Sequence, residues 1–560
     1  MPTNENPWVD GLTIGNLLQR TILSHGSREA LVFPPLGYRR SWSEFGLEVE
    51  HAAAALIAMG VQPGEHVAVW ATNWPEWVVL QFATANIGAV LVNINPAYRS
   101  HELQYVLSQA DITTLFLTDR FKGSDYFALL GEVCPEIAQC PPGELKAINC
   151  PLLRRVISIK ESKGTGIWNW GEFLAKSKAV DQQAFHLRTR LVRPDDVVNI
   201  QFTSGTTGFP KGAMLTHRNL LVNAYYVGQR QRFSVADRLC IPVPLYHCFG
   251  CVLGTLVCAI YAATMVFPSE SFDPVATLQA IHQERCTALY GVPTMFIAEL
   301  NCPQLPEFDL SSLRTGIMAG SPCPIEVMRA VGDKLGAREL TIAYGLTEAS
   351  PIITQTEVTD SLEHRVGTVG QALPGLEVML VQPGTLQPVP AGQSGELVVR
   401  GPGNMKGYYR KPADSAAAMT PDGWLRTGDL ALQTTDGYYR ITGRIKDVII
   451  RGGENIYPRE IEEFLYSHPA IADVQVVGLP DAHFGEEVSA WICLKVGYRL
   501  TEQEVREFCR GKIAHYKVPR HVIFVQEYPK TVTGKIQKFK LREIGIEQFG
   551  LQTASRMETA

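Results

Sequence analysis

Glycines, hydroxyl side chains and one lysine are concentrated in residues 202–212, which read FTSGTTGFPKG between two apolar stretches. Glycines allow backbone N–H groups to turn toward a ligand, hydroxyls add donors, and Lys211 adds a mobile charge. This composition predicts a site for the phosphates of a nucleotide. It is not a Walker loop, because Lys211 is followed by Gly212 rather than by Ser or Thr. The alternative, a flexible Ser/Thr/Gly turn, is disfavoured by so many ordered positions.

Two further stretches carry residues suited to a nucleotide. Residues 343–348 read AYGLTE directly after a predicted strand, and they offer a flat ring, a glycine, a hydroxyl and a carboxylate. These groups suit adenine, phosphate and a bound Mg²⁺, although a tyrosine that merely closes a strand is the alternative. Residues 424–430 read WLRTGDL, where an aspartate fixed by a turn could accept from both ribose hydroxyls or simply stabilise that turn.

The last two stretches lie near the end of the chain. Residues 443–447 read GRIKD and run on to RGGENI at 451–456, and residues 529–536 read PKTVTGKI. A lone lysine after a Thr-Gly turn is usually a solvated surface residue, so this motif gains meaning only together with the others.

Composition excludes several classes of protein. The chain has 560 residues, enough for about three or four domain-sized units, with 46% hydrophobic and 19% charged residues. The net charge of −5 gives no basic footprint for nucleic acid. Twelve cysteines in so long a chain predict reduced thiols and a cytoplasmic location rather than a disulfide scaffold. The first seven residues show no signal peptide.

One charge-free segment could be mistaken for a membrane span. Residues 239–269 contain no Asp, Glu, Lys or Arg, and residues 250–267 are strongly apolar. Pro242 and Pro244 interrupt its start, and its centre is rich in Gly, Ala, Thr and Cys. We therefore expect a helix buried in a large core and no integral membrane span.

The order of apolar runs predicts an α/β fold. Strand-like and helical runs alternate from residue 30 to residue 117, which is typical of βαβ units and a parallel sheet. We interpret residues 134–190 as an irregular, polar surface excursion. Short β runs with Gly and Pro turns occupy 375–445, and a small α+β unit follows. The prediction is a large N-terminal domain (1–445) of parallel-type sheets with helices plus a β-rich subdomain, and a small mobile C-terminal domain (446–560).

In this order and spacing, the five motifs closely resemble the adenylate-forming superfamily, which includes acyl-CoA synthetases, luciferases and the adenylation domains of peptide synthetases. The resemblance covers residues 15 to 540. Three stretches, NINPAYR at 93–99, FKGSDY at 121–126 and PLYHC at 244–248, look most like the medium-chain fatty-acyl-CoA synthetase branch.

The resemblance implies a two-step reaction in which a carboxylate reacts with Mg·ATP to give an acyl-adenylate, and coenzyme A then displaces AMP. It assigns Lys535 to the transferred carboxylate and α-phosphate, Thr347 to the α-phosphate, and Lys446 to a hinge between domains. Glu348 and Thr207 would hold Mg²⁺. ATP would contact Thr203, Ser204, Gly205, Thr206, Thr207, Gly208, Lys211 and Gly345. Adenine would be framed by Gly320, Ser321, Pro322 and Tyr344, and the ribose would be bound by Asp429 and Arg444. The coenzyme A path would be lined by Arg451, Gly452 and Gly453.

His247 matches the family position beside the reacting acyl group, so we favour a catalytic-site role over a structural one. Cys248 and Cys251 form a CxxC pair, but nothing completes a zinc site. Amino-acid-activating relatives place an Asp near His247, and this chain has none there. Apolar neighbours fit a hydrocarbon acid: Phe249, Val252, Leu253 and Leu256.

The leading hypothesis is a fatty-acid–CoA ligase whose partners are small molecules, with a homodimer left open. A ligase for aryl or other small carboxylates is the alternative within the same class. From different classes, a membrane transport component and an adenylate-binding protein without turnover are disfavoured. Intact Lys535, Glu348 and Lys211 argue against the latter.

Overall fold

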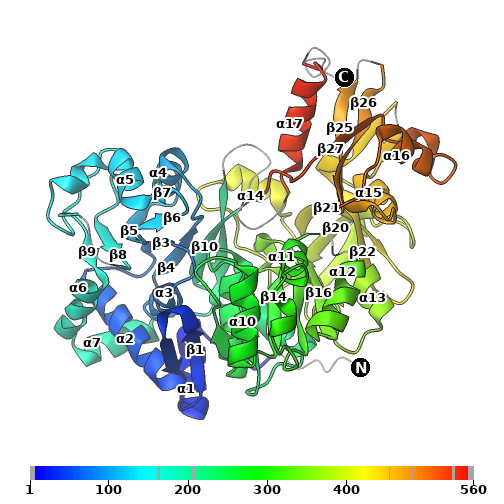
Figure 1. Cartoon of the computed structure of the whole chain (residues 1–560). Helices are drawn as coiled ribbons and strands as arrows, with labels where there is room; N and C mark the ends of the chain where they lie inside the picture. Colours follow the sequence, from blue (N-terminus) through cyan, green and yellow to red (C-terminus); the bar gives the residue numbers. More distant parts are fainter. Residues whose placement is uncertain are drawn as a thin grey trace. The chain divides into compact units, whose positions relative to one another are not determined.

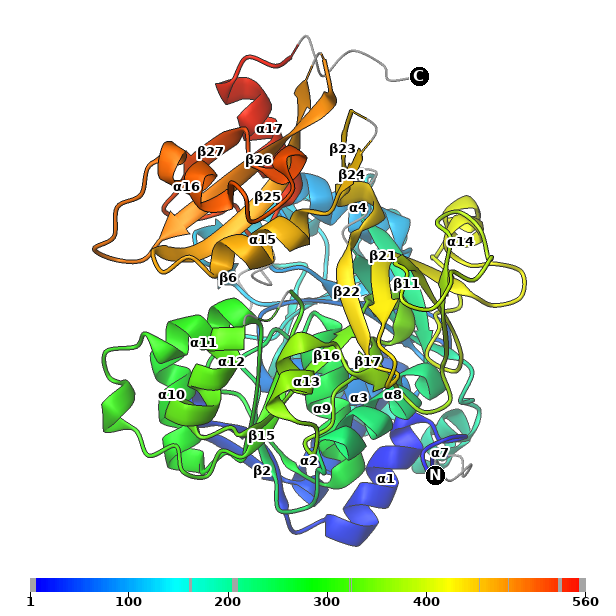
Figure 2. The same ribbon diagram turned by 90° about the vertical axis from the view of Figure 1, so that its right-hand side faces the viewer.

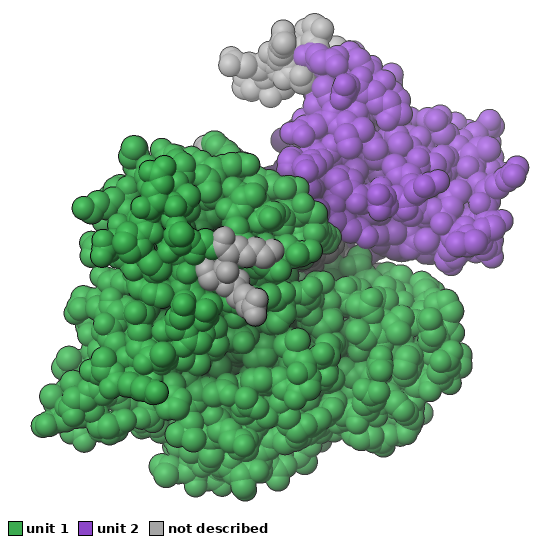
Figure 3. Space-filling model, turned by 60° about the vertical axis from the view of Figure 1, so that its left-hand side comes forward, with its two compact units in different colours: residues 1–378, 399–425 green, residues 379–398, 426–560 purple. Residues whose placement is uncertain are grey.

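The protein was described from a computed structural model that covers residues 7–160, 164–203, 210–321, 323, 325–452, 454–481, 483–531 and 536–552 (Figure 1). The chain forms two compact units, coloured separately in Figure 3. Unit 1 comprises residues 1–378 and 399–425, and unit 2 comprises residues 379–398 and 426–560. The chain therefore passes from one unit to the other three times.

A seven-stranded sheet in unit 1 carries the glycine-rich stretch at its edge. Its strands, in spatial order, are β11 (Lys211–Thr216), β10 (Val197–Thr203), β4 (Val90–Ile94), β3 (His66–Trp70), β5 (Ile112–Leu117), β8 (Arg155–Ser158) and β9 (Trp168–Asn169). All neighbours are parallel except β10 and β11, which form an antiparallel pair. Strands β3, β4 and β5 are buried along their whole length, as expected of parallel strands covered on both faces.

A nine-stranded sheet supplies the second half of unit 1. Its order is β18 (Gln371–Ala372), β17 (Ile352–Gln355), β16 (Glu339–Gly345), β15 (Thr315–Ala319), β14 (Ala288–Gly291), β12 (Arg238–Cys240), β13 (Thr264–Val266), β1 (Glu29–Phe33) and β2 (Tyr38–Ser41). The strands from β16 to β1 are parallel, and β2, β17 and β18 are antiparallel. The predicted parallel alternation is therefore confirmed for both large sheets.

Helices cover these sheets. Helix α8 (His217–Arg230) contacts β11 of one sheet and β17 of the other, so it lies between them (Figure 2). Thr216 caps α8, because its hydroxyl accepts from the Asn219 amide at 3.1 Å. The other helices of unit 1 are α1 (Ile14–His25), α2 (Trp42–Ala58), α3 (Pro75–Asn86), α4 (Ser100–Gln109), α5 (Tyr126–Val133), α6 (Trp170–Ala175), α7 (Gln182–Arg190), α9 (Thr255–Tyr261), α10 (Pro274–Glu284), α11 (Pro293–Leu300), α12 (Ile325–Ala330), α13 (Leu362–Gly367) and α14 (Pro412–Ala418).

The charge-free segment is part of the core of unit 1. Residues Phe249–Gly254 form a π-helical turn that continues into α9, and every residue from 249 to 259 is buried. Strand β13 then follows at residue 264. Among the described residues, no helix is both long and apolar enough to cross a membrane. The expectation of a buried helix is confirmed.

The description of residues 134–190 as a surface excursion is wrong. Strand β8 pairs in parallel with β5 and extends the seven-stranded sheet. Leu145, Cys150, Leu153 and Val156 all join the core beneath it. The strand was hidden because its first residue is charged. The Arg155 guanidinium is nevertheless buried, and it forms an ion pair with Glu65 at 3.1 Å.

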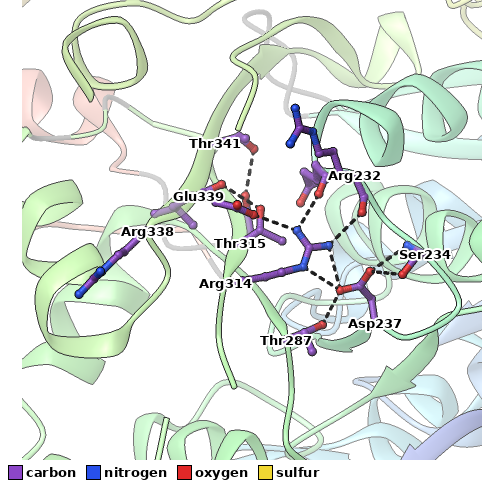
Figure 4. A network of polar contacts seen from close by, with 12 residues as sticks. Arg232, Ser234, Asp237, Thr287, Arg314, Thr315, Arg338, Glu339 and Thr341 are labelled. Atoms are coloured by element: carbon purple, nitrogen blue, oxygen red, sulfur yellow. Dashed lines mark hydrogen bonds and ion pairs between the residues drawn. The ribbon is translucent and has the colours of Figure 1, made fainter. Parts of the chain in front are cut away.

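An ion pair between the buried Asp237 and the partly exposed Arg314 fixes the beginning of strand β15. Arg314 donates to Asp237 through Nε at 3.1 Å and Nη2 at 2.9 Å, and to the carbonyl oxygens of residues 231 and 232 (Figure 4). Thr287 and Ser234 also donate to the Asp237 carboxylate. This network ties the loop after α8 to strands β14, β15 and β16 of the nine-stranded sheet.

Two sheets contribute to unit 2. A four-stranded sheet has the order β19 (Glu377–Val381), β20 (Gly395–Arg400), β21 (Leu425–Gln433) and β22 (Tyr439–Arg444), and β21 and β22 are antiparallel. A second sheet contains β24 (Glu454–Ile456), β23 (Ile449–Arg451), β26 (Gly485–Leu494), β25 (Ile471–Asp481) and β27 (His521–Phe524), with β27 beside β26. Its helices are α15 (Pro458–Tyr466), α16 (Glu502–Cys509) and α17 (Lys538–Gln548). The small α+β unit predicted beyond residue 447 is present. The boundary between functional domains at residue 445 remains a prediction, because the compact units divide the chain elsewhere.

Candidate nucleotide and acyl site

The glycine-rich stretch begins and ends at paired positions of two strands. Thr203 ends β10, Lys211 begins β11, and the two residues are direct partners in the antiparallel ladder. The sequence folds this way because apolar runs on both sides of the glycines pair as neighbouring strands. Most of the predicted phosphate contacts lie in the loop between these two residues. They fall outside the described residues: Ser204, Gly205, Thr206, Thr207 and Gly208.

The structure brings Glu348 to the same place. Glu348 lies in a 3₁₀ turn (Thr347–Ala349) directly after β16, and its side chain is buried, with 7% of the residue exposed. The Thr203 hydroxyl donates to Glu348 Oε1 at 3.2 Å, and the Tyr408 hydroxyl donates to the same oxygen at 2.8 Å. Two predicted site residues that are 145 positions apart in the sequence are therefore in contact.

Lys211 is held by a residue that the sequence did not single out. Its ammonium group forms an ion pair with Asp414 of α14 and lies 5.4 Å from the centre of the Tyr408 ring. The side chains of Lys211 and Asp414 are 17% and 32% exposed, so the pair is partly shielded from water. The lysine is thus already fixed beside the ring of Tyr408, whose hydroxyl donates to Glu348.

The predicted adenine frame lies at the carboxyl ends of two neighbouring parallel strands. Gly320 and Ser321 follow β15 and are exposed, whereas Tyr344 and Gly345 end β16. A Cβ at Gly345 would approach the carbonyl oxygen of Pro351 to 1.9 Å, so only glycine fits there. The end of a parallel sheet is a common place for ligands. Pro322 lies outside the described residues.

His247 and Thr347 are linked through a cysteine. The Nδ1 atom of His247 accepts a hydrogen bond from the Phe249 amide at 3.2 Å, which requires that Nδ1 carry no proton in this geometry. The Cys248 sulfur lies 3.5 Å from that nitrogen and 3.8 Å from Thr347 Oγ1. His247 therefore lies close to the residue assigned to the α-phosphate.

The stretch that follows His247 in the sequence is apolar and buried, as expected. The residues predicted to accept a hydrocarbon are buried in unit 1: Phe249, Val252, Leu253 and Leu256. Neither Cys248 nor Cys251 is part of a disulfide, and burial raises the pKa of the Cys251 thiol. Within the described ranges, no group of three His, Cys, Asp or Glu side chains could hold a metal ion.

In unit 2, the two residues assigned to ribose are partners. Asp429 and Arg444 lie opposite each other on β21 and β22, and Arg444 Nε is 3.1 Å from Asp429 Oδ1. The expectation that a turn fixes Asp429 is wrong. Gly428 has a positive φ of 70°, but the strand continues through it, and the β22 ladder holds the aspartate.

The residues assigned to the hinge and to coenzyme A follow in unit 2. Lys446 is exposed in a 3₁₀ turn (Ile445–Asp447) after β22. Arg451 forms two hydrogen bonds to Glu487, at 2.8 and 2.9 Å, which raise the pKa of the guanidinium. Its charge is therefore already neutralised by a buried carboxylate. Gly452 is described, whereas Gly453 and Lys535 lie outside the described residues.

Sequence reasoning missed Tyr408 and Asp414. Neither lies in a motif that points to a ligand. Tyr408 is 60 positions from its partner Glu348, and Asp414 is 203 positions from its partner Lys211. A nearby local signal is the sequence GPG at residues 401–403, which is typical of a turn. That turn is present, since the Asn404 amide donates to the Gly401 carbonyl at 3.2 Å. It brings the following residues alongside β11.

Comparison with known proteins places this site in a family. The model of the AMP-binding enzyme family matches residues 18–409, and that of the AMP-binding enzyme C-terminal domain matches residues 460–535. YngI of Bacillus subtilis (strain 168), an acyl-CoA synthetase by name, is 51% identical over 97% of this chain and 98% of its own length. The zebrafish (Danio rerio) mitochondrial medium-chain acyl-CoA ligase ACSF2 is 45% identical over 98% of this chain and 92% of its own.

The fold agrees with a solved structure that contains a reaction intermediate. The anthranilate CoA ligase AuaEII, in complex with anthranoyl-AMP, superposes with a TM-score of 0.85 at 26% identity, over 96% of this chain and 98% of that one. The resemblance inferred from the motifs is confirmed. With family matches across both parts of the sequence and relatives that align over nearly all of it, this chain belongs to the AMP-binding enzyme family.

Proposed function

We propose that this protein ligates a straight-chain fatty acid of medium length to coenzyme A through an acyl-adenylate. It is an AMP-forming acid–thiol ligase of the acyl-CoA synthetase type. The observation that carries this proposal is the meeting of Thr203, Glu348 and Lys211 at the ends of β10, β11 and β16. The acyl preference is supported by the apolar stretch that follows His247 and by the names of the relatives.

Each half-reaction can be written from these groups. In the first, a carboxylate oxygen attacks the α-phosphorus of ATP, the bond to the β-phosphate oxygen breaks, and pyrophosphate leaves. In the second, the thiol of coenzyme A loses its proton and its sulfur attacks the acyl carbon, so the carbon–oxygen bond to AMP breaks. Lys211 would contact the outer phosphates, Thr347 the α-phosphate, and Asp429 with Arg444 the ribose.

The donor set near the phosphates fits a magnesium ion. Glu348 is a buried carboxylate, and no described Lys or Arg forms an ion pair with it. Mg²⁺ is usually held by one or two carboxylates together with substrate phosphates, so one protein carboxylate is sufficient. Glu348 would hold the ion, with Thr207 as the second assigned ligand. The bound ion would neutralise phosphate charge.

The preferred acid can be found with a pyrophosphate-release screen. Acids from acetate to palmitate, and benzoate, are supplied with ATP, with and without coenzyme A. We expect kcat/KM to rise about fourfold for each added carbon until the pocket ends, because each buried CH₂ contributes ~0.8 kcal/mol. A flat profile would contradict the proposal, and a preference for benzoate would favour the alternative, a ligase for aryl or other small carboxylates.

Asp429→Ala should raise the KM for ATP roughly 10- to 150-fold while the fold is retained. Loss of a hydrogen bond between a carboxylate and ribose hydroxyls costs about 1.5–3 kcal/mol, which corresponds to that change. Initial rates at varied ATP concentration measure it. Asp436→Ala, in an exposed turn of the same unit, is the control. If the KM for ATP is unchanged in Asp429→Ala, Asp429 does not bind the ribose and serves only to pair with Arg444.

We also propose that the enzyme acts in the cytoplasm on small molecules. The twelve cysteines, none of which is part of a disulfide, support this location. The relatives from vertebrates are named mitochondrial, so fractionation of cells that express the protein is the appropriate test. A homodimer remains open to measurement by sedimentation.

A further inference from the structure

Residues 406–409 run alongside strand β11 within unit 1, and we call residues 405–415 the flanking segment. The Lys406 amide donates to the Met214 carbonyl at 2.9 Å, and the Met214 amide donates to the Gly407 carbonyl at 2.9 Å. The Tyr409 amide donates to the Gly212 carbonyl at 2.8 Å, so the segment extends the sheet beyond β11. A further bond, from the Met405 amide to the Glu348 carbonyl at 2.8 Å, ties it to the turn that carries Glu348.

A second set of contacts anchors the flanking segment at its middle. The Tyr409 hydroxyl donates to Asp111 at 2.9 Å, and Arg410 forms an ion pair with the same carboxylate at 2.6 Å. Asp111 and Arg410 both have positive φ, at 46° and 52°, which is uncommon for residues other than glycine. Such conformations persist where the surrounding contacts determine them. The segment is therefore held rigidly on both sides of Tyr408.

This anchored backbone directs the Tyr408 phenol at Glu348. The hydroxyl lies 2.8 Å from Oε1, which is shorter than the 3.2 Å contact from Thr203 to the same oxygen. A tyrosine phenol carries its proton at neutral pH, so it can donate to the carboxylate. Among the described residues, both hydrogen bonds to this carboxylate are made to Oε1, which leaves Oε2 for another partner.

We propose that Tyr408 is a positioning residue for the divalent cation, a proposal that rests on the function proposed above. Its phenol fixes the Glu348 carboxylate so that one oxygen is directed at the metal that accompanies ATP. Tyr408 touches neither nucleotide nor metal in this role. It acts through Glu348, as groups hydrogen-bonded to metal ligands generally do, and their loss typically lowers metal affinity or activity 10- to 100-fold.

The test is the affinity of Mn²⁺, followed by electron paramagnetic resonance, in the presence of an ATP analogue with a methylene group between the α- and β-phosphorus atoms. This analogue cannot release pyrophosphate, so binding is measured apart from turnover. We expect Tyr408→Phe to weaken Mn²⁺ binding about 10-fold or more. Analogue binding without metal should stay within twofold of wild type.

Tyr261→Phe is the matched control. This variant also removes a tyrosine hydroxyl. In the wild type that hydroxyl donates to the carbonyl of Tyr225 in α8 at 2.7 Å, and not to Glu348. It should leave Mn²⁺ affinity unchanged. As a second readout, single-turnover adenylate formation by Tyr408→Phe should recover toward the wild-type rate as Mg²⁺ is raised, which a general loss of structure would not produce.

Three outcomes would overturn the proposal. If Tyr408→Phe folds and binds Mn²⁺ as tightly as wild type, Tyr408 does not position Glu348, and the function proposed above is unaffected. If wild type binds neither the analogue nor Mn²⁺ and releases no pyrophosphate, both proposals fail. Should Tyr408→Phe not fold, Thr203→Val removes the other donor to Oε1 and should weaken Mn²⁺ binding severalfold; wild-type affinity in that variant would contradict the proposal.

Discussion

Lys535→Ala should slow acyl-adenylate formation by roughly 10²–10³, the loss typical when a donor to developing negative charge is removed. The resemblance assigns Lys535 to the carboxylate and α-phosphate oxygens, where negative charge concentrates in the first step. The residue lies outside the described part of the chain, so kinetics must decide its role. Thioester formation from supplied acyl-adenylate should continue at a rate close to that of wild type.

Gly453→Trp is the complementary variant. We expect it to leave pyrophosphate release intact and to impair thioester formation, because its ring would fill the path assigned to the thiol. Lys446→Pro, which fixes φ near −65°, should give the same pattern by restricting the hinge. Single-turnover rates of each half-reaction on each variant measure the difference. If Lys535→Ala and Gly453→Trp slow both half-reactions equally, the C-terminal domain does not contribute different residues to adenylate formation and to thioester formation.

Arg314→Leu should destabilise unit 1 by about 3 kcal/mol, because it leaves the Asp237 carboxylate buried without its cation. The aspartate side chain is only 4% exposed, and Arg314 also donates to two backbone carbonyls that would lose these bonds (Figure 4). The value lies at the lower end of the range for a broken buried pair, since Thr287 and Ser234 continue to donate to Asp237.

Urea unfolding of wild type and variant, followed by tryptophan fluorescence, measures this change. Arg329→Leu is the control, because Arg329 forms an exposed ion pair with Glu326 on α12 and its loss should change stability by less than about 0.5 kcal/mol. If the two variants unfold at the same urea concentration, the Arg314 network contributes no more than a surface pair does.

The central strands of the two large sheets were predictable because most of their residues are apolar. Strands β3, β4 and β5 are buried on both faces, so every position favours a hydrophobic residue. Strand β8 escaped notice because it is short and begins with Arg155, whose burial depends on Glu65, 90 positions earlier. No local pattern reports a partner so distant.

The same distinction separates the parts of the site. Glycines, hydroxyls and Lys211 could be recognised because they stand together in one stretch. The partners of Lys211 and Glu348 could not be recognised, because Asp414 and Tyr408 come into contact with them only in the folded structure. Asp429 was misplaced in a turn for a related reason. The local sequence TGD is typical of a turn, whereas pairing with β22 keeps the residue in a strand.

The ladder that pairs Asp429 with Arg444 has a consequence for the order in which products leave. Both residues precede Lys446, and the hydrogen bonds between β21 and β22 join them directly. A rotation of the backbone at residue 446 therefore moves neither residue relative to the other. If the ribose binds this pair, as proposed, the nucleotide would stay anchored to it while the chain beyond residue 446 changes orientation. Pyrophosphate would then leave after the first step, and AMP would stay bound until the thioester has formed.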